Sequence, residues 1–154
     1  KQVHHEPLRR FLLPTSGGEH ARCAETYVAS MARTRDGTLT ICGVIAPHAG
    51  EQDIQNTRRR LETVAARVGT NGHLQVRTKL IRHQSVSIGI LQEARDHDAV
   101  VIGAAGHSVY PHILFGSIPE TVAKRSDCPV ILVKHHHPVK ALVGRVMGEE
   151  ELDS

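Results

Sequence analysis

The sequence has few aromatic residues and few cysteines. Only 3% of its 154 residues are Phe, Trp or Tyr, so it lacks the aromatic side chains on which proteins stack single-stranded nucleic acid. Its three cysteines, Cys23, Cys42 and Cys128, are odd in number, widely spaced and never in a CxxC pair. This spacing argues against a disulfide framework and a thiolate zinc site, and it fits a reducing compartment.

A long apolar run and a strong net charge are also missing. No stretch approaches the roughly 20 consecutive apolar residues of a membrane-spanning helix, and no signal peptide opens the chain. The formal net charge is +3, which is too small a bias to indicate a nucleic-acid partner. We therefore expect one soluble, cytoplasmic domain with no nucleic-acid ligand.

Apolar residues follow two alternating spacings along the chain. Short apolar or β-branched runs indicate strands at 11–13, 39–46, 74–80, 99–102 and 129–133. Helical spacing indicates four helices between them, beginning near Glu19, Ile54, Ser85 and Ser117. Five strands alternating with helices predict an α/β fold, in which a parallel sheet carries helices on both faces.

The polarity of individual strands predicts their places in the sheet. Residues 74–80 alternate between apolar and polar, which is typical of a strand with one exposed face at the edge of a sheet. Residues 99–102 are apolar throughout and predict a strand buried on both faces. Cys42 lies inside an apolar stretch, so we expect it to be a small core residue rather than a nucleophile.

A glycine loop follows the apolar strand at 99–102. Gly103 and Gly106 enclose two residues, and nine residues later Gly116 and Ser117 precede a predicted helix. In open α/β sheets, ligands bind beyond the carboxyl ends of the strands, and glycines there let backbone N–H groups approach phosphate oxygens. The loop therefore favours a phosphate-bearing ligand, although a tight turn alone would also explain glycines at a strand end.

Ser117 has a structural interpretation as well. The segment Ser117-Ile118-Pro119-Glu120 has the pattern of a capping box, with Ser117 as the N-cap and Glu120 three residues later. The two interpretations are compatible, because backbone donors can hold a phosphate while the hydroxyl caps the helix.

The spacing of Gly103, Gly106, Gly116 and Ser117 resembles the ATP-binding signature of the universal stress protein family. The resemblance covers residues 9–134, with residues 1–8 left as a leader or linker and residues 135–154 as a C-terminal tail. It implies the Rossmann-like fold of that family, a five-stranded parallel sheet in the order 3-2-1-4-5. It also implies an adenine nucleotide ligand. The candidates are ATP bound together with Mg²⁺, AMP and a cyclic dinucleotide.

The resemblance assigns the nucleotide to a set of loop and strand-end residues. The turn after the first strand and one residue of the second would meet the adenine, while the glycine loop would hold phosphates and ribose. The expected site residues are Pro14, Thr15, Ser16, Val44, Gly103, Gly106, His107, Gly116, Ser117 and Ile118.

Two of these residues depart from the family pattern. Ser16 stands where nucleotide-binding members usually carry Asp, and His107 stands where Lys or Arg is common. The loss of a charged hydrogen bond costs roughly 1.5–3 kcal/mol, about one to two decades in dissociation constant. We therefore expect weak or pH-dependent binding, or a ligand other than ATP.

The sequence offers no set of residues for catalysis beside the glycine loop. It contains no general base, nucleophile or dedicated magnesium ligand there, and Asp98 belongs to the opposite end of its strand. Ser16-Gly17-Gly18 resembles the phosphate loop of ATP pyrophosphatases, but His20 and Ala21 replace the Asp-Ser pair of that loop. We predict a binding module rather than an enzyme.

The histidine run at residues 135–137 is the remaining candidate for a site. Adjacent residues at a strand exit point in different directions, and no carboxylate or thiolate is clustered with them in the sequence. We expect a solvated turn there rather than a metal site.

The segment 115–120 and the tail after Pro138 are similar to universal stress domains at the cytoplasmic C-terminus of amino-acid permeases and cation/proton antiporters. The chain begins with Lys1 rather than methionine, which fits a domain excised from a longer protein. Two hypotheses stay open. The chain is either a nucleotide-sensing regulatory module, such as the cytosolic domain of a transporter, or a dimeric stress or interaction protein that binds no nucleotide. The resemblance and the apolar run 130–133 both predict a homodimer through the fifth strand.

Overall fold

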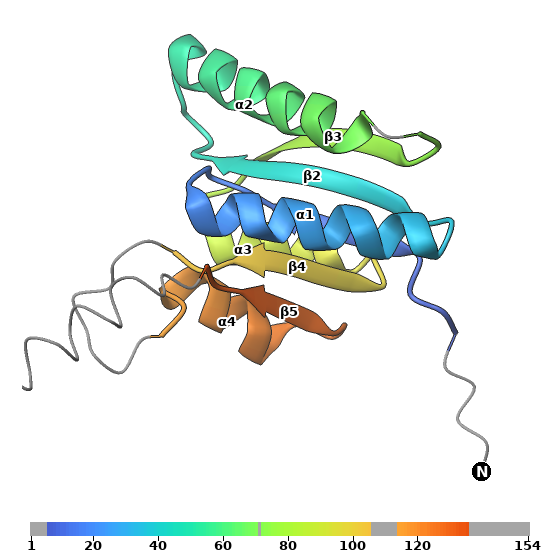
Figure 1. Cartoon of the computed structure of the whole chain (residues 1–154). Coiled ribbons are helices and arrows are strands. Elements are labelled where there is room, and N and C mark those ends of the chain that lie inside the picture. The colour runs from blue at the N-terminus through green and yellow to red at the C-terminus, as the bar shows by residue number, and fades with distance from the viewer. Residues whose placement is uncertain (1–5, 71, 106–113, 136–154) are drawn as a thin grey trace, which may run out of the picture.

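The computed structural model describes residues 6–70, 72–105 and 114–135. Strands and helices alternate through these residues in the order shown in Figure 1. The strands are β1 (Arg10–Pro14), β2 (Thr38–Ile45), β3 (Gln75–Arg82), β4 (Ala99–Gly103) and β5 (Val130–Val133). The helices are α1 (Glu19–Thr34), α2 (Glu51–Gly69), α3 (Val86–Ala94) and α4 (Ser117–Arg125).

All five strands form one parallel sheet in the order β3-β2-β1-β4-β5. The chain adds β2 and β3 on one side of β1, and then β4 and β5 on its other side. This reversal between β1 and β4 is the point at which open α/β sheets bind ligands. The predicted fold class and the strand order implied by the family resemblance are both confirmed.

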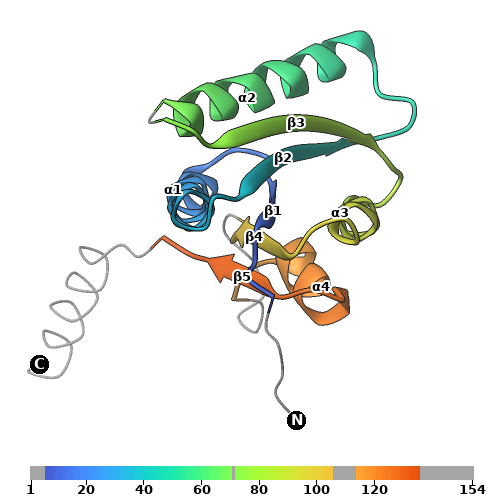
Figure 2. The same cartoon turned by 90° about the vertical axis from the view of Figure 1, so that its right-hand side faces the viewer.

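Two apolar cores lie on opposite faces of the sheet. One core joins α1 and α2 to the sheet through residues such as Val28 and Leu61, and the other joins α3 and α4 through residues such as Ile90 and Val122. Figure 2 shows α1 on one side of the sheet and α3 and α4 on the other. Alternate residues of β1 supply the two cores, since Phe11 and Leu13 face α1 whereas Leu12 faces α3.

The exposure of the edge and central strands matches the polarity patterns of their sequences. Strand β3 is an edge with mostly exposed residues, while β4 is buried from Ala99 to Ile102. Cys42 is fully buried, and burial raises the pKa of its thiol to about 12. The burial confirms that Cys42 is a core residue, and a thiol with a raised pKa is a poor nucleophile at neutral pH.

Asp98 lies at the amino end of the sheet, away from the carboxyl ends of the strands. Its carboxylate accepts hydrogen bonds from the backbone N–H groups of Arg9 (3.0 Å) and Arg10 (2.8 Å) and from the Arg10 guanidinium (2.7 Å). These bonds lower the pKa of Asp98 to about 2. The carboxylate thus joins the starts of β1 and β4 and stands apart from the glycine loop, as predicted.

The start of α4 differs from the capping box expected at Ser117. Gly116, with φ of 101°, is the N-cap, and Ser117 is the first helical residue with no side-chain cap bond. The Glu120 carboxylate accepts hydrogen bonds from the N–H groups of Leu114 (3.0 Å) and Phe115 (3.2 Å) instead. The capping-box prediction is wrong because a glycine in the left-handed region begins the helix one residue earlier.

Candidate functional site

A cavity of about 200 Å³ opens at the carboxyl ends of β1, β2 and β4. Its position matches the point where the strand order reverses. Its walls come from three strand ends and all four helices, so residues far apart in the sequence meet there. The lining residues are Pro14, Thr15, Ser16, Gly17, Ala21, Cys42, Gly43, Val44, Thr57, Arg60, Val86, Ile90, Ile102, Gly103, Ala104, Ala105, Ile118 and Pro119.

Six of the ten residues expected from the sequence line this cavity. They are Pro14, Thr15, Ser16, Val44, Gly103 and Ile118. Gly116 and Ser117 are described but do not line it, although Gly116 lies against Ala105, which does. Gly106 and His107 lie outside the described residues.

The turn after β1 is held in place by Thr15. Its backbone N–H donates to the carbonyl oxygen of Cys42 (2.9 Å), and its hydroxyl accepts a hydrogen bond from the N–H of Gly17 (3.2 Å). Thr15 is buried, whereas Ser16 is exposed at the cavity. The turn therefore presents the Ser16 side chain without relying on it for its own shape.

Packing accounts for both described glycines of the loop, Gly103 and Gly116. A Cβ on Gly103 would lie 2.7 Å from the carbonyl carbon and oxygen of His20, so glycine lets α1 approach β4. At Gly116 the positive φ and the side chain of Ala105 leave no room for a Cβ. Their presence alone therefore does not distinguish a ligand-binding loop from a structural one.

The segment that leads into α4 is fixed by several hydrogen bonds. The N–H of Ala105 donates to the Phe115 carbonyl (2.7 Å), and the Lys134 ammonium group donates to the Leu114 carbonyl (3.1 Å). Among the described residues, no side chain caps the start of α4. The helix therefore directs uncapped N–H groups and the positive end of its dipole beside the cavity wall formed by Ile118.

Sequence reasoning missed the contribution of α2 to the cavity. Thr57 is a buried polar residue in a helical stripe of apolar residues, between Ile54 and Leu61. Arg60 belongs to the run Arg58-Arg59-Arg60, whose charge by itself indicates a solvent-exposed helix face, yet it lines the cavity. The polar residue inside the apolar stripe was the available signal at Thr57, whereas no sequence pattern distinguished Arg60 from its neighbours.

The described part of the chain offers no metal centre. It contains no cluster of three His, Cys, Asp or Glu side chains, and no carboxylate is among the residues that line the cavity. His135, the one described member of the histidine run, donates its backbone N–H to Nδ1 of His20 (2.9 Å). No helix among the described residues has the length and apolarity that a bilayer crossing requires.

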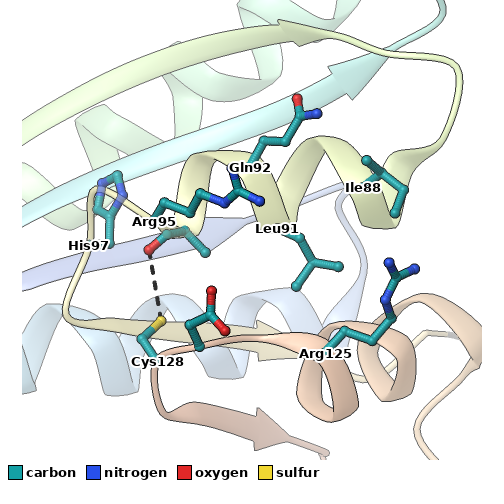
Figure 3. Close-up of a pocket in the computed structure, with 9 residues that line it drawn as sticks. Ile88, Leu91, Gln92, Arg95, His97, Arg125 and Cys128 are labelled. Atoms are coloured by element: carbon teal, nitrogen blue, oxygen red, sulfur yellow. Dashed lines mark hydrogen bonds between the residues drawn. The ribbon is translucent and has the colours of Figure 1, made fainter.

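A further cavity of about 340 Å³ lies between the ends of α3 and α4, near the amino ends of β4 and β5. Figure 3 shows Leu91 and Cys128 within it, and the Cys128 thiol lies 3.9 Å from the Ala94 carbonyl oxygen. Charges of both signs surround it, since Asp127 lines it together with Arg95 and Arg125.

The fold and the cavity define a class before any comparison is made. A doubly wound parallel sheet with a cavity at its reversal point is the arrangement of Rossmann-like ligand-binding domains. The sequence model described as Universal stress protein family matches residues 7–134, so the chain belongs to that family. This match confirms the family resemblance inferred from the glycine spacing.

Individual relatives are distant in sequence but similar in structure. Universal stress protein MJ0531 of Methanocaldococcus jannaschii is 22% identical over an alignment of 142 positions that covers 82% of each chain. The universal stress protein from Archaeoglobus fulgidus in complex with dAMP has a TM-score of 0.70, at 20% identity over 84% of this chain and 100% of that one. A universal stress protein in complex with cAMP has a TM-score of 0.71, at 19% identity over 83% and 98%.

Proposed function

We propose that this chain is a regulatory module that binds an adenine nucleotide in the cavity at the carboxyl ends of β1, β2 and β4. The observation that carries the proposal is the convergence of Thr15, Val44 and Ile118 at one cavity. Complexes of similar proteins with dAMP and cAMP support an adenine nucleotide as the ligand class. We propose binding rather than catalysis, because no carboxylate or ionised thiol is among the described residues that line the cavity.

The chemistry of the walls suits the parts of a nucleotide. Val44, Val86, Ile90 and Ile102 form apolar walls for a base. The uncapped start of α4 suits phosphate oxygens, because helix N-termini bind anions. By family resemblance, Gly106 and His107 complete the phosphate site and Gly116 and Ser117 lie close to it, and ATP with Mg²⁺, AMP and cyclic dinucleotides are the candidate ligands.

Calorimetric titration with AMP, ATP, cyclic AMP and cyclic di-AMP tests this proposal, and Ile118→Asp is the informative variant. A carboxylate in the first turn of α4 is favourable for the helix but repels phosphate, so folding should persist while affinity falls roughly tenfold or more. Gln52→Asp adds the same charge to the first turn of α2, away from the cavity, and should bind as the unmodified chain does. If every nucleotide fails to bind at millimolar concentration, the proposal is wrong.

Ser16→Asp tests the same site by a gain of affinity. The family pattern has Asp at this position, and Ser16 is exposed at the cavity, so the substitution can supply a charged hydrogen-bond acceptor to the nucleoside without disturbing the core. We expect about tenfold tighter binding of AMP by calorimetry. An unchanged or weaker affinity would mean that the nucleoside does not lie beside Ser16.

One observation favours the second hypothesis, an interaction protein with no nucleotide. Gly103 and Gly116 are both required by packing, so the glycine pattern persists in a domain whose loop holds nothing. The titrations above distinguish the two hypotheses directly. Under either one, we propose a homodimer through β5, and the resemblance of the segment 115–120 to transporter-linked domains supports attachment to a membrane transporter as the context of regulation.

A further inference from the structure

A groove adjoins the proposed nucleotide site on the side of α2. It has a volume of about 330 Å³ and lies between the β1–α1 turn, α1 and α2. It shares Gly17 and Arg60 with the nucleotide cavity. The Cδ and Nε atoms of Arg60 lie 3.9 Å from the position that a Cβ on Gly17 would take. The groove and the cavity therefore meet at this turn.

Arginines dominate the lining of this groove, which we call the arginine groove. Arg22, Arg59, Arg60 and Arg67 line it, together with a single acid, Glu25. The buried Glu25 carboxylate accepts a hydrogen bond from Arg67 Nη1 at 3.0 Å.

The other three guanidinium groups remain available to a ligand. Within the described part of the chain, the side chains of Arg22, Arg59 and Arg60 form no hydrogen bond or ion pair. Burial raises the pKa of Glu25, and the charges of Arg67 and Arg22 oppose that rise. The one acid thus neutralises part of the groove and leaves a net positive site.

The start of α1 adds backbone donors to the same groove. Gly17 and Gly18, with φ of 93° and 98°, line it, and Gly18 is an N-cap without a side chain. The N-cap residue of α1 therefore supplies no side-chain cap to its first N–H groups. The positive end of the α1 dipole and three unpaired guanidinium groups both favour an anion there.

The arginine groove and the start of α4 lie on opposite sides of the nucleotide cavity. Ala105 and Ile118 form its wall on the side of β4 and α4, whereas Thr57 and Arg60 form its wall on the side of α2. In the sheet order, β4 and β2 flank β1 on opposite sides. A ligand that fills the cavity therefore has one anion-binding region on each side of its base and ribose.

We infer that the natural ligand is a nucleotide with two separate phosphate groups, one beside the start of α4 and the other in the arginine groove. This inference rests on the proposed nucleotide function and specifies its ligand class. Arginine suits the second phosphate because its planar guanidinium group binds phosphate oxygens in pairs. Ligands of this class include adenosine 3′,5′-bisphosphate and dinucleotides, whereas AMP has a group for only one of the two regions.

Calorimetry with AMP, adenosine 3′,5′-bisphosphate and cyclic di-AMP tests the inference on the full chain. At least one of the two-phosphate probes should bind roughly tenfold or more tightly than AMP. In Arg22→Gln/Arg59→Gln this advantage should be lost while the affinity for AMP stays within about twofold. Arg58→Gln/Arg77→Gln removes the same charge at exposed positions outside the groove and should keep the advantage.

The outcomes separate this inference from the function on which it rests. If AMP binds but neither two-phosphate probe binds more tightly, the inference is overturned and nucleotide binding stands. An advantage that survives in Arg22→Gln/Arg59→Gln, or that falls equally in Arg58→Gln/Arg77→Gln, also overturns it, because the second phosphate then lies elsewhere or responds only to net charge. If no nucleotide binds at all, the proposed function fails and the inference fails with it.

Discussion

Glu25 is a carboxylate within the apolar stripe of α1, between Ala24 and Val28. The sequence shows the helix but not the reason for this residue, because its partner Arg67 lies 42 positions away on α2. The same limit applies to Arg60, whose run of three arginines predicts only exposure. Helical periodicity identifies which face of a helix is buried, whereas contacts between two helices depend on the packing of both against the sheet.

At the residue scale, we predict how the contribution of Asp98 to stability depends on pH. Its pKa is lowered from 3.8 to about 2, so its contribution to stability is present above about pH 4 and is lost as the pH falls through 2. Because Arg10 is largely exposed, we expect Asp98→Asn to lower the free energy of unfolding by only about 1–2 kcal/mol at pH 7. Urea denaturation should show this difference narrowing between pH 4 and pH 2.

A neighbouring aspartate provides the control for that measurement. Asp96 is exposed, and its side chain accepts no hydrogen bond from the described residues. Asp96→Asn should leave the free energy of unfolding nearly unchanged. If Asp98→Asn lowers the free energy of unfolding by the same amount at pH 7 and at pH 2, the ionised carboxylate does not cause the stabilisation.

At the scale of elements, α3 and α4 show why one helix start was predicted correctly and the other was not. Ser85 and Ser117 both precede or open a helical pattern in the sequence. Ser85 is the N-cap of α3 and accepts a hydrogen bond from the Ile88 N–H at 3.4 Å. Ser117 is displaced from this role by Gly116, which has a φ of 101° and packs against Ala105. That tertiary contact cannot be read from the local sequence.

The two serines therefore predict different costs of substitution. Ser85→Ala should lower the free energy of unfolding by about 0.5–1 kcal/mol, because α3 loses its side-chain cap. Ser117→Ala should change it by less than about 0.3 kcal/mol without ligand, because its hydroxyl caps nothing. Thermal and urea denaturation of the two variants measure this difference. If both substitutions lower the free energy of unfolding equally, the Ser117 hydroxyl does cap α4.

At the scale of the whole molecule, the alternation of strands and helices was sufficient for the fold class. The strand order came from the family resemblance, and the sheet confirms it. The glycine loop identified the correct end of the sheet, because ligands of open α/β sheets lie beyond the carboxyl ends of strands. The full lining of the cavity could not be predicted, since Thr57 and Val86 reach it from helices on opposite faces.

The last prediction concerns dimer formation at one of the two edges of the sheet. Strand β3 is an edge with polar residues, whereas β5 reads Val-Ile-Leu-Val and leaves three of its four residues only half-buried. An exposed apolar edge favours pairing with a second strand, and a two-fold axis beside β5 would pair it with its own copy. We therefore expect a homodimer by light scattering, and monomers for Ile131→Lys.

Val76→Lys on β3 is the matched control for that substitution. Val76 and Ile131 are both half-buried edge residues that pack against the same core. If β5 forms the interface, both variants should lose similar stability, but only Ile131→Lys should lose the dimer. A native chain that is monomeric at high micromolar concentration, or an Ile131→Lys variant that remains dimeric, would contradict the prediction, because the edge of β5 would then be covered without a second copy of the chain.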